Sequence, residues 1–228
     1  MEAEASLLAT LNHPNVLRGM GLGCDPMTGE PRWIVTELAD GNLSTYLRSV
    51  QVTPQRFLLF CSDVLAGLEY LHHHEVMHRD LKPDNVLCFR QASGSRGVVY
   101  KLGDVGEARE RRTATMSAGG TPVWTAPEIS TGHYDGRADV YSFGLMTAAV
   151  VSGHLILPGP APPPTPTALD GPDFPTQQQD FVAAAGARCD RLWPSLSRFL
   201  SACTHRQPSR RLTATQALRQ LRLVARRP

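Results

Sequence analysis

The sequence predicts an α+β fold, with several helices and two pairs of short strands. Residues 54–71 carry apolar side chains at spacings of three and four, which is the pattern of a helix with one buried face. Residues 137–152 are apolar nearly all round, as in a helix at the centre of a domain. Residues 16–22 and 32–38 have the pattern of strands on either side of a turn rich in proline and glycine.

The N-terminal elements follow in order. Leucines at helical spacing predict a short helix over 2–12, which stops before Pro14 because proline disfavours helical backbone in the residue before it. After the first strand pair, Asn42 is expected to cap a helix that runs to about Val50. Pro54 is expected to start the long amphipathic helix.

The second strand pair is expected at 86–89 and 98–102. Residues 158–175 contain eight of the 18 prolines, so we expect an extended surface loop there rather than a helix or a central strand. The chain returns to helix at 193–203 and again at 213–224.

Size, charge and cysteine usage exclude several classes of protein. A chain of 228 residues suits one large domain, or one domain and part of another. Lys and Arg total 23 against 21 Asp and Glu, so the charge balance gives no reason to expect a nucleic-acid partner. Five widely spaced cysteines without a CxxC pair favour reduced, buried thiols over a disulfide framework or a zinc site. No signal peptide and no apolar run of about 20 residues is visible, so no membrane span is expected and the default location is cytoplasmic.

The most informative segment is HRDLKPDN at residues 78–85. A loop of this pattern supplies an aspartate to accept the proton of an attacking hydroxyl and an asparagine to hold a metal ion. Asp104 follows Asp80 by 24 residues, at the end of a predicted strand, where a carboxylate can bind Mg²⁺ that bridges phosphates. Glu128, in the sequence APE, comes another 24 residues later.

With these motifs the chain resembles the eukaryotic protein kinase family over almost its whole length. The resemblance implies a bilobal fold: a mainly α-helical large lobe at 42–228, a hinge at 37–41, and an incomplete β-rich small lobe at 1–36. It also implies ATP and Mg²⁺ as cofactors and proteins bearing Ser or Thr hydroxyls as substrates.

The same resemblance assigns roles to individual residues. Asp80 is the catalytic base, Lys82 steadies the transferring phosphate, and Asn85 and Asp104 hold Mg²⁺. Thr121 matches the residue that hydrogen-bonds the base and shapes the substrate site.

Two further features of the resemblance concern subclass and structure. Lys82 looks like serine/threonine specificity, and the strings at 120–128 and 139–144 look most like the tyrosine-kinase-like group of such kinases. Asp139 matches the buried aspartate that fixes the catalytic loop from the central helix. By resemblance Glu128 should pair with Arg211.

The nucleotide-binding residues are placed the same way. Thr36 resembles the gatekeeper, and the Glu37 carbonyl and the Ala39 amide would meet adenine. Glu4 matches the helix glutamate that pairs with the ATP-binding lysine in the family.

The chain departs from the family at its start. Only three residues precede Glu4, so the Gly-rich loop and the strand lysine cannot lie in this sequence. The only two lysines, Lys82 and Lys101, are already placed by other motifs. We therefore expect roughly the first three strands of the nucleotide lobe to be missing. Val105 also stands where the family usually has Phe, a change we expect to be tolerated.

Three interpretations stay open. The chain is an active serine/threonine kinase, a fragment of a longer active kinase, or a catalytically impaired pseudokinase that acts as a binding or scaffold module. The missing lysine favours the last, whereas the intact HRDLKPDN and Asp104 disfavour it. We prefer the fragment, because the break falls at the start of a helix.

Other sequence features have two interpretations each. Phosphates on Thr113, Thr115 or Ser117 can pair with Arg79, or the loop merely contains exposed hydroxyls. The run at 158–175 is a docking ligand for a polyproline-reading partner, or more simply a passive insertion. Residues 72–74 are consecutive histidines at a helix end, where dipole stabilisation or plain solvation is favoured over a metal site.

Overall fold

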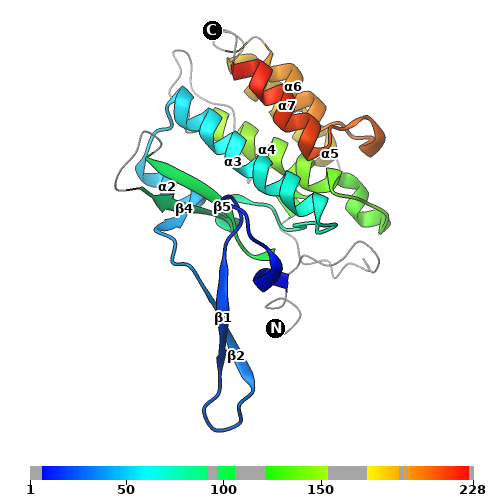
Figure 1. The fold of residues 1–228 in the computed structure, drawn as a ribbon. Coiled ribbons are helices and arrows are strands. Elements are labelled where there is room, and N and C mark those ends of the chain that lie inside the picture. Colours follow the sequence, from blue (N-terminus) through cyan, green and yellow to red (C-terminus); the bar gives the residue numbers. More distant parts are fainter. Residues whose placement is uncertain are drawn as a thin grey trace.

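The computed structural model describes residues 7–91, 97–105, 122–153, 174–189, 193 and 195–225. Figure 1 shows a body of packed helices, a small sheet beneath α3, and a strand hairpin that extends away from both. The elements in chain order are β1 (Gly19–Cys24), β2 (Pro31–Thr36), β3 (Gly41–Asn42), α2 (Leu43–Ser49), α3 (Pro54–His73), η1 (Pro83–Asn85), β4 (Val86–Arg90), β5 (Val98–Leu102), η3 (Pro122–Trp124), η4 (Pro127–Thr131), α4 (Arg137–Gly153), α5 (Phe174–Cys189), α6 (Leu196–Cys203), η6 (Pro208–Arg210) and α7 (Ala214–Ala225). Residues 7–10 are also helical. The predicted α+β class is confirmed.

The strands form two antiparallel sheets. Strands β1 and β2 pair with each other in a hairpin, and β3, β4 and β5 pair in that order. In the second sheet Leu87 lies opposite Lys101. Val16 adds a parallel bridge to Leu102, which ties the segment before β1 to the end of β5. Both predicted strand pairs are therefore present.

Local chemistry explains where α2 and α3 begin. The Asn42 side chain accepts a hydrogen bond from the Thr45 amide, and the Thr45 hydroxyl bonds back to the Asn42 amide, which forms a capping box. Thr53 caps α3, with Pro54 in its first turn, where the missing amide hydrogen costs nothing. Both helix starts agree with the sequence prediction.

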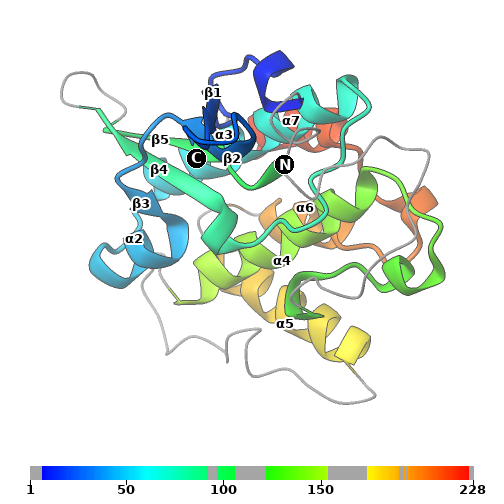
Figure 2. The same ribbon diagram turned by 90° about the horizontal axis from the view of Figure 1, so that it is seen from below.

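Helix α4 lies at the centre of the helical body, among α3, α5 and α6 (Figure 2). Its Val140, Phe143, Leu145 and Met146 are fully buried, as the all-round apolar pattern predicts. The core continues into α3, where Phe57, Leu65 and Leu68 are buried too, and these share one hydrophobic cluster with α4. This core supports the loop that follows α3.

The predicted loop at 158–175 is wrong at its end, because α5 begins at Phe174. A proline in the first turn is compatible with a helix, so Pro175 does not prevent one. The rest of α5 was also missed, although Phe181, Val182, Ala185 and Cys189 are buried at helical spacing. The remaining part, 158–173, lies outside the described residues.

Two smaller differences concern buried side chains. Helix α6 begins at Leu196, later than the predicted start at Trp193, because proline at position 194 disfavours helical backbone in the residue before it. The Trp193 ring stacks on Phe57 with ring centres 5.3 Å apart. All five cysteines are free thiols, and four are buried, but Cys24 is exposed at the end of β1. None of the described helices is both long and apolar enough to cross a membrane.

Candidate active site

The HRDLKPDN loop is held in place by a single buried carboxylate from α4. Asp139 accepts hydrogen bonds from the backbone amides of His78 at 2.9 Å and Arg79 at 2.8 Å. The same carboxylate accepts from Nε2 of His72 at 2.8 Å. Arg79 has a left-handed φ of 69°, which costs energy for a non-glycine residue and is stabilised here by the bond to its amide. The predicted role of Asp139 in fixing this loop is confirmed.

Burial and hydrogen bonding together set the charge states of Asp139 and His78. Burial alone would raise the pKa of Asp139, but the hydrogen bond and positive field of His72 outweigh it and lower the pKa. Burial lowers the pKa of His78, against the opposing field of Asp139, so its ring is neutral at physiological pH. The loop is therefore anchored by one carboxylate that remains ionised.

Two predicted catalytic residues, Asp80 and Lys82, and one predicted metal ligand, Asn85, come together within this loop. Lys82 Nζ lies 2.5 Å from Oδ2 of Asp80. Asn85 Nδ2 donates to the same oxygen at 3.0 Å and to the Asp80 carbonyl at 2.8 Å. Side-chain exposure is 17% for Asp80 and 23% for Lys82, so both are shielded but open to a substrate. The Asp80 carboxylate is thus oriented by two donors.

The predicted metal ligands lie next to this carboxylate. The Gly103 amide donates to the Asn85 carbonyl at 2.8 Å, which holds the backbone before Asp104 beside Asn85. Asp104 is exposed and has a left-handed φ of 53°. Asn85 uses its amide nitrogen on Asp80, so that contact leaves its side-chain oxygen Oδ1 available. Two hard oxygen donors of this kind suit Mg²⁺, which usually takes its other ligands from water and phosphate.

The part of the chain that the structure describes contains no group of three His, Cys, Asp or Glu side chains arranged to hold a metal ion.

The predicted hinge joins β2 to β3. The Glu37 amide donates to the Arg18 carbonyl at 3.2 Å, and its carboxylate accepts from the Arg18 amide at 2.9 Å. Each Glu37 carboxylate oxygen lies 2.7 Å from Lys101 Nζ. On the other side, the Asp40 amide donates to the Cys88 carbonyl at 3.0 Å. The backbone between these anchors includes Ala39.

Two predicted site residues, Glu4 and Thr121, lie outside the described residues, as do Thr113, Thr115 and Ser117. Two residues of the site were missed by sequence reasoning. The position of His72 at a helix end predicts dipole or solvent contacts, but His72 binds Asp139. It lies four residues after the buried Leu68, on the packed side of α3, and that spacing was the available signal. Lys101 is predicted only as a strand residue, but it binds Glu37 of the predicted hinge.

A family model described as the protein kinase domain matches residues 1–221. The chain belongs to the protein kinase family. Mitogen-activated protein kinase kinase kinase 3 of Arabidopsis thaliana is 30% identical over 96% of this chain and 32% of its own length. Serine/threonine-protein kinase pkn2 of Myxococcus xanthus is 33% identical over 86% of this chain and 23% of its own. Serine/threonine-protein kinase WNK3 of Mus musculus is 39% identical over 62% of this chain and 8% of its own.

The kinase chain thus spans about a third or less of the length of these relatives. The predicted resemblance to serine/threonine protein kinases is confirmed. The predicted pairing of Glu128 with Arg211 is confirmed as well: Arg211 donates to the Glu128 carboxylate, with 2.9 Å between Nη2 and Oε2. The Arg211 side chain is fully buried.

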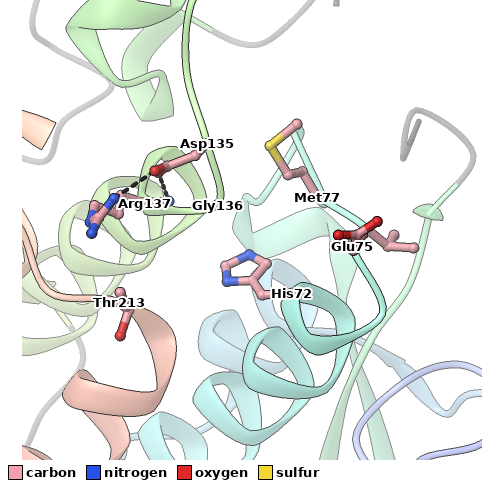
Figure 3. Close-up of a pocket in the computed structure, with 8 residues that line it drawn as sticks. His72, Glu75, Met77, Asp135, Gly136, Arg137 and Thr213 are labelled. Atoms are coloured by element: carbon pink, nitrogen blue, oxygen red, sulfur yellow. Dashed lines mark hydrogen bonds and ion pairs between the residues drawn. The ribbon is translucent and has the colours of Figure 1, made fainter. Parts of the chain in front are cut away.

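A small pocket lies beside the segment that precedes the HRDLKPDN loop of this kinase (Figure 3). It has a volume of about 160 Å³ and lies between the end of α3, the start of α4 and the start of α7. Its lining includes His72, Glu75, Met77, Asp135 and Arg137, but not Asp80, Asn85 or Asp104. Asp135 and Arg137 are already paired to each other at 2.6 Å. The pocket is therefore separate from the predicted phosphoryl-transfer residues.

Proposed function

We propose that this chain is the catalytic domain of a protein serine/threonine kinase, which transfers the γ-phosphate of ATP to Ser or Thr hydroxyls. The observation that carries the proposal is the Asp80 carboxylate, oriented by Lys82 and Asn85 within a loop that Asp139 anchors. Phosphoryl transfer needs little covalent chemistry from the protein and depends on positioning and charge stabilisation. The loop supplies both.

Each residue has a role in this proposal. Asp80 accepts the proton of the substrate hydroxyl, and Lys82 neutralises charge that develops on the transferred group. Asn85 and Asp104 hold Mg²⁺, and Mg·ATP supplies the phosphoryl group when bound. Thr121 stays a prediction for the substrate side of the site.

In this proposal the nucleotide binds at the hinge at 37–41, between a small lobe at 1–36 and a large lobe at 42–228. The Glu37 carbonyl and the Ala39 amide face adenine in this arrangement. Substrates are proteins, as for the family. The tyrosine-kinase-like subgroup and a polyproline-reading partner at 158–175 stay predictions from the sequence.

We also propose that strands preceding residue 1 complete the small lobe in a longer product. The β1–β2 hairpin leaves Met20, Leu22, Trp33 and Val35 between 42% and 67% exposed. A two-stranded hairpin with an uncovered apolar surface is marginally stable by itself. Additional strands would bury these side chains, and a lysine among them would give Glu4 its partner.

The function is tested by measuring Mg·ATP-dependent phosphate incorporation into a generic basic protein substrate. We expect the longer product, with its upstream strands, to transfer phosphate, and Asp80→Asn to lower the rate by at least about 100-fold, a typical loss for a positioned acid or base. Phosphoamino-acid analysis should show phosphoserine or phosphothreonine. Phosphotyrosine alone, or equal rates with Asp80→Asn, would contradict the proposal.

A second candidate is a non-catalytic binding module. One observation favours it: both lysines of the chain are already paired, Lys82 with Asp80 and Lys101 with Glu37. If every product of the gene lacks upstream strands and no transfer is measured, this second function replaces the first.

A further inference from the structure

Lys101 joins the sheet of the large lobe to the connection that forms the hinge. Its ammonium lies 2.7 Å from both carboxylate oxygens of Glu37 and 4.6 Å from the centre of the Phe89 ring. Side-chain exposure is 16% for Lys101 and 25% for Glu37, so solvent screens this pair less than it screens an exposed one. The ring and the carboxylate together fix the position of the ammonium.

Glu37 in turn is fixed in more than one direction. Its amide and its carboxylate both bond to the backbone of Arg18, which leads into β1. Fixing the Glu37 side chain to Lys101 therefore also fixes its backbone and the peptide that follows. Three residues later, the Asp40 amide bonds to Cys88 on β4. Contacts at both ends of the hinge therefore join it to the β4–β5 pair.

Strand β5 also determines where Asp104 lies. Lys101 comes three residues before Asp104, and the intervening Leu102 is held on both sides by backbone bonds to Asn15 and Leu17. A single strand thus carries the hinge contact near its end and the predicted metal ligand just beyond it. Strand backbone of this kind is stiff compared with a loop, so the two ends of the nucleotide site share one rigid support.

We propose that Lys101 is a positioning residue for nucleotide binding. Its pair with Glu37 holds the Glu37 carbonyl and the Ala39 amide at a fixed place relative to Asp104, so the purine and phosphate ends of a nucleotide meet preformed partners. This inference rests on the proposed function, because it assumes that the hinge receives a purine. Pre-organisation of this kind raises affinity by avoiding the cost of ordering the site on binding.

The test compares nucleotide affinity in four single variants and one double variant of the longer product. Lys101→Met removes the charge at similar length, Lys101→Arg keeps it, and Glu37→Gln weakens the acceptor. Arg32→Met is the matched control, because Arg32 makes an ion pair with Asp25 at 3.0 Å on the same hairpin, away from the hinge. Affinity is measured by titration of a fluorescent ATP analogue with Mg²⁺, well below the melting temperature of each variant.

We expect Lys101→Met to weaken binding about tenfold, within the usual range of coupling between linked groups. Lys101→Arg should recover most of the affinity, and Arg32→Met should match the unsubstituted chain. Because Lys101 and Glu37 act as one unit, combining Lys101→Met with Glu37→Gln should cost no more than the larger single effect.

Hydrogen exchange separates positioning from simple stability. In the nucleotide-free protein, the amides of Glu37 and Asp40 should exchange faster in Lys101→Met but not in Arg32→Met. A lower melting temperature with unchanged affinity overturns the inference alone, as does weaker binding without faster exchange. Absence of nucleotide binding by the unsubstituted longer product overturns the proposed function and this inference with it.

Discussion

At the scale of single residues, the site depends on side chains that act on backbone. Asp139 does not touch a reacting group in the proposed mechanism, but it satisfies two amides of the catalytic loop and one histidine. A buried amide that loses its acceptor costs about 1–3 kcal/mol, so this one carboxylate determines whether the loop keeps its conformation. Lys101 acts on the hinge in the same indirect way.

His78 makes the stability of the folded protein depend on pH. Burial lowers the pKa of His78 below its usual value of 6.5, so the unfolded chain binds a proton that the folded chain does not. The stabilising contribution is complete above about pH 6.5 and is lost as the pH falls toward the lower, folded pKa. His13, whose pKa is also lowered by burial, contributes in the same direction.

We therefore predict that the free energy of unfolding falls between pH 7 and pH 5, as measured by urea denaturation at several pH values. His78→Phe should flatten this dependence, whatever its effect on stability at pH 7. His73→Phe, at an exposed position, is the control and should leave the slope unchanged. A slope that His78→Phe does not alter would show that other groups cause it.

Residue-level prediction from the sequence succeeded where the partners are close in the chain. Asp80, Lys82 and Asn85 lie within one short loop, so their convergence follows from the motif itself. The role of His72 and the hinge contact of Lys101 were not predicted. Their partners are 67 and 64 residues away, and only the packing of α3 on α4 and of β5 beside the hinge brings them together.

At the scale of elements, α3 packs closely against the backbone of a neighbouring segment at one glycine. A Cβ atom on Gly67 would lie 2.6 Å from the Asn15 carbonyl oxygen and 2.9 Å from Leu102. That carbonyl accepts from the Leu102 amide, so it is part of the bridge that positions β5. The glycine is in a helix, where alanine is normally preferred by about 1 kcal/mol.

We predict that Gly67→Ala destabilises the protein by about 1–3 kcal/mol despite its better helix propensity, because the new methyl group collides with backbone. Gly153→Ala lies at the end of α4, where a new Cβ would have no described atom from another element within 4 Å, so it should change stability by much less. Thermal unfolding followed by circular dichroism measures both. Stabilisation by Gly67→Ala would contradict the packing described here.

Element prediction from the sequence was reliable for capped and periodic segments. Asn42 and Pro54 marked helix starts by local hydrogen bonding and backbone restriction, which act within a few residues. The prediction failed at α5, because the proline run before it predicts a loop and its own apolar spacing is a weaker signal. That helix is specified by its packing against α4 and α6, which no local rule contains.

At the scale of the whole molecule, Arg211 connects parts of the chain that are distant in sequence. Besides Glu128, it donates to the carbonyls of Arg137 at 2.9 Å and His205 at 2.9 Å. Its guanidinium carbon also lies 4.7 Å from the centre of the Tyr141 ring. One buried side chain thus joins η4, the start of α4 and the segment after α6.

We predict that Arg211→Met lowers the free energy of unfolding by about 3–5 kcal/mol, because it leaves the Glu128 carboxylate without its buried partner. The double variant Arg211→Met with Glu128→Gln should be less destabilised than the sum of the two single changes. Chemical denaturation of the four proteins gives the cycle. Strict additivity would mean that the pair contributes no coupling.

The two paired lysines have a consequence for protein chemistry on this domain. Lys82 and Lys101 are the only side-chain amines in 228 residues, and they lie at opposite ends of the predicted nucleotide site. An acylating reagent that consumes either ammonium removes an ion pair with Asp80 or with Glu37. Labelling, cross-linking or immobilisation through lysine would therefore disturb one end of the predicted nucleotide site, whereas coupling through the exposed Cys24 thiol would leave both pairs intact.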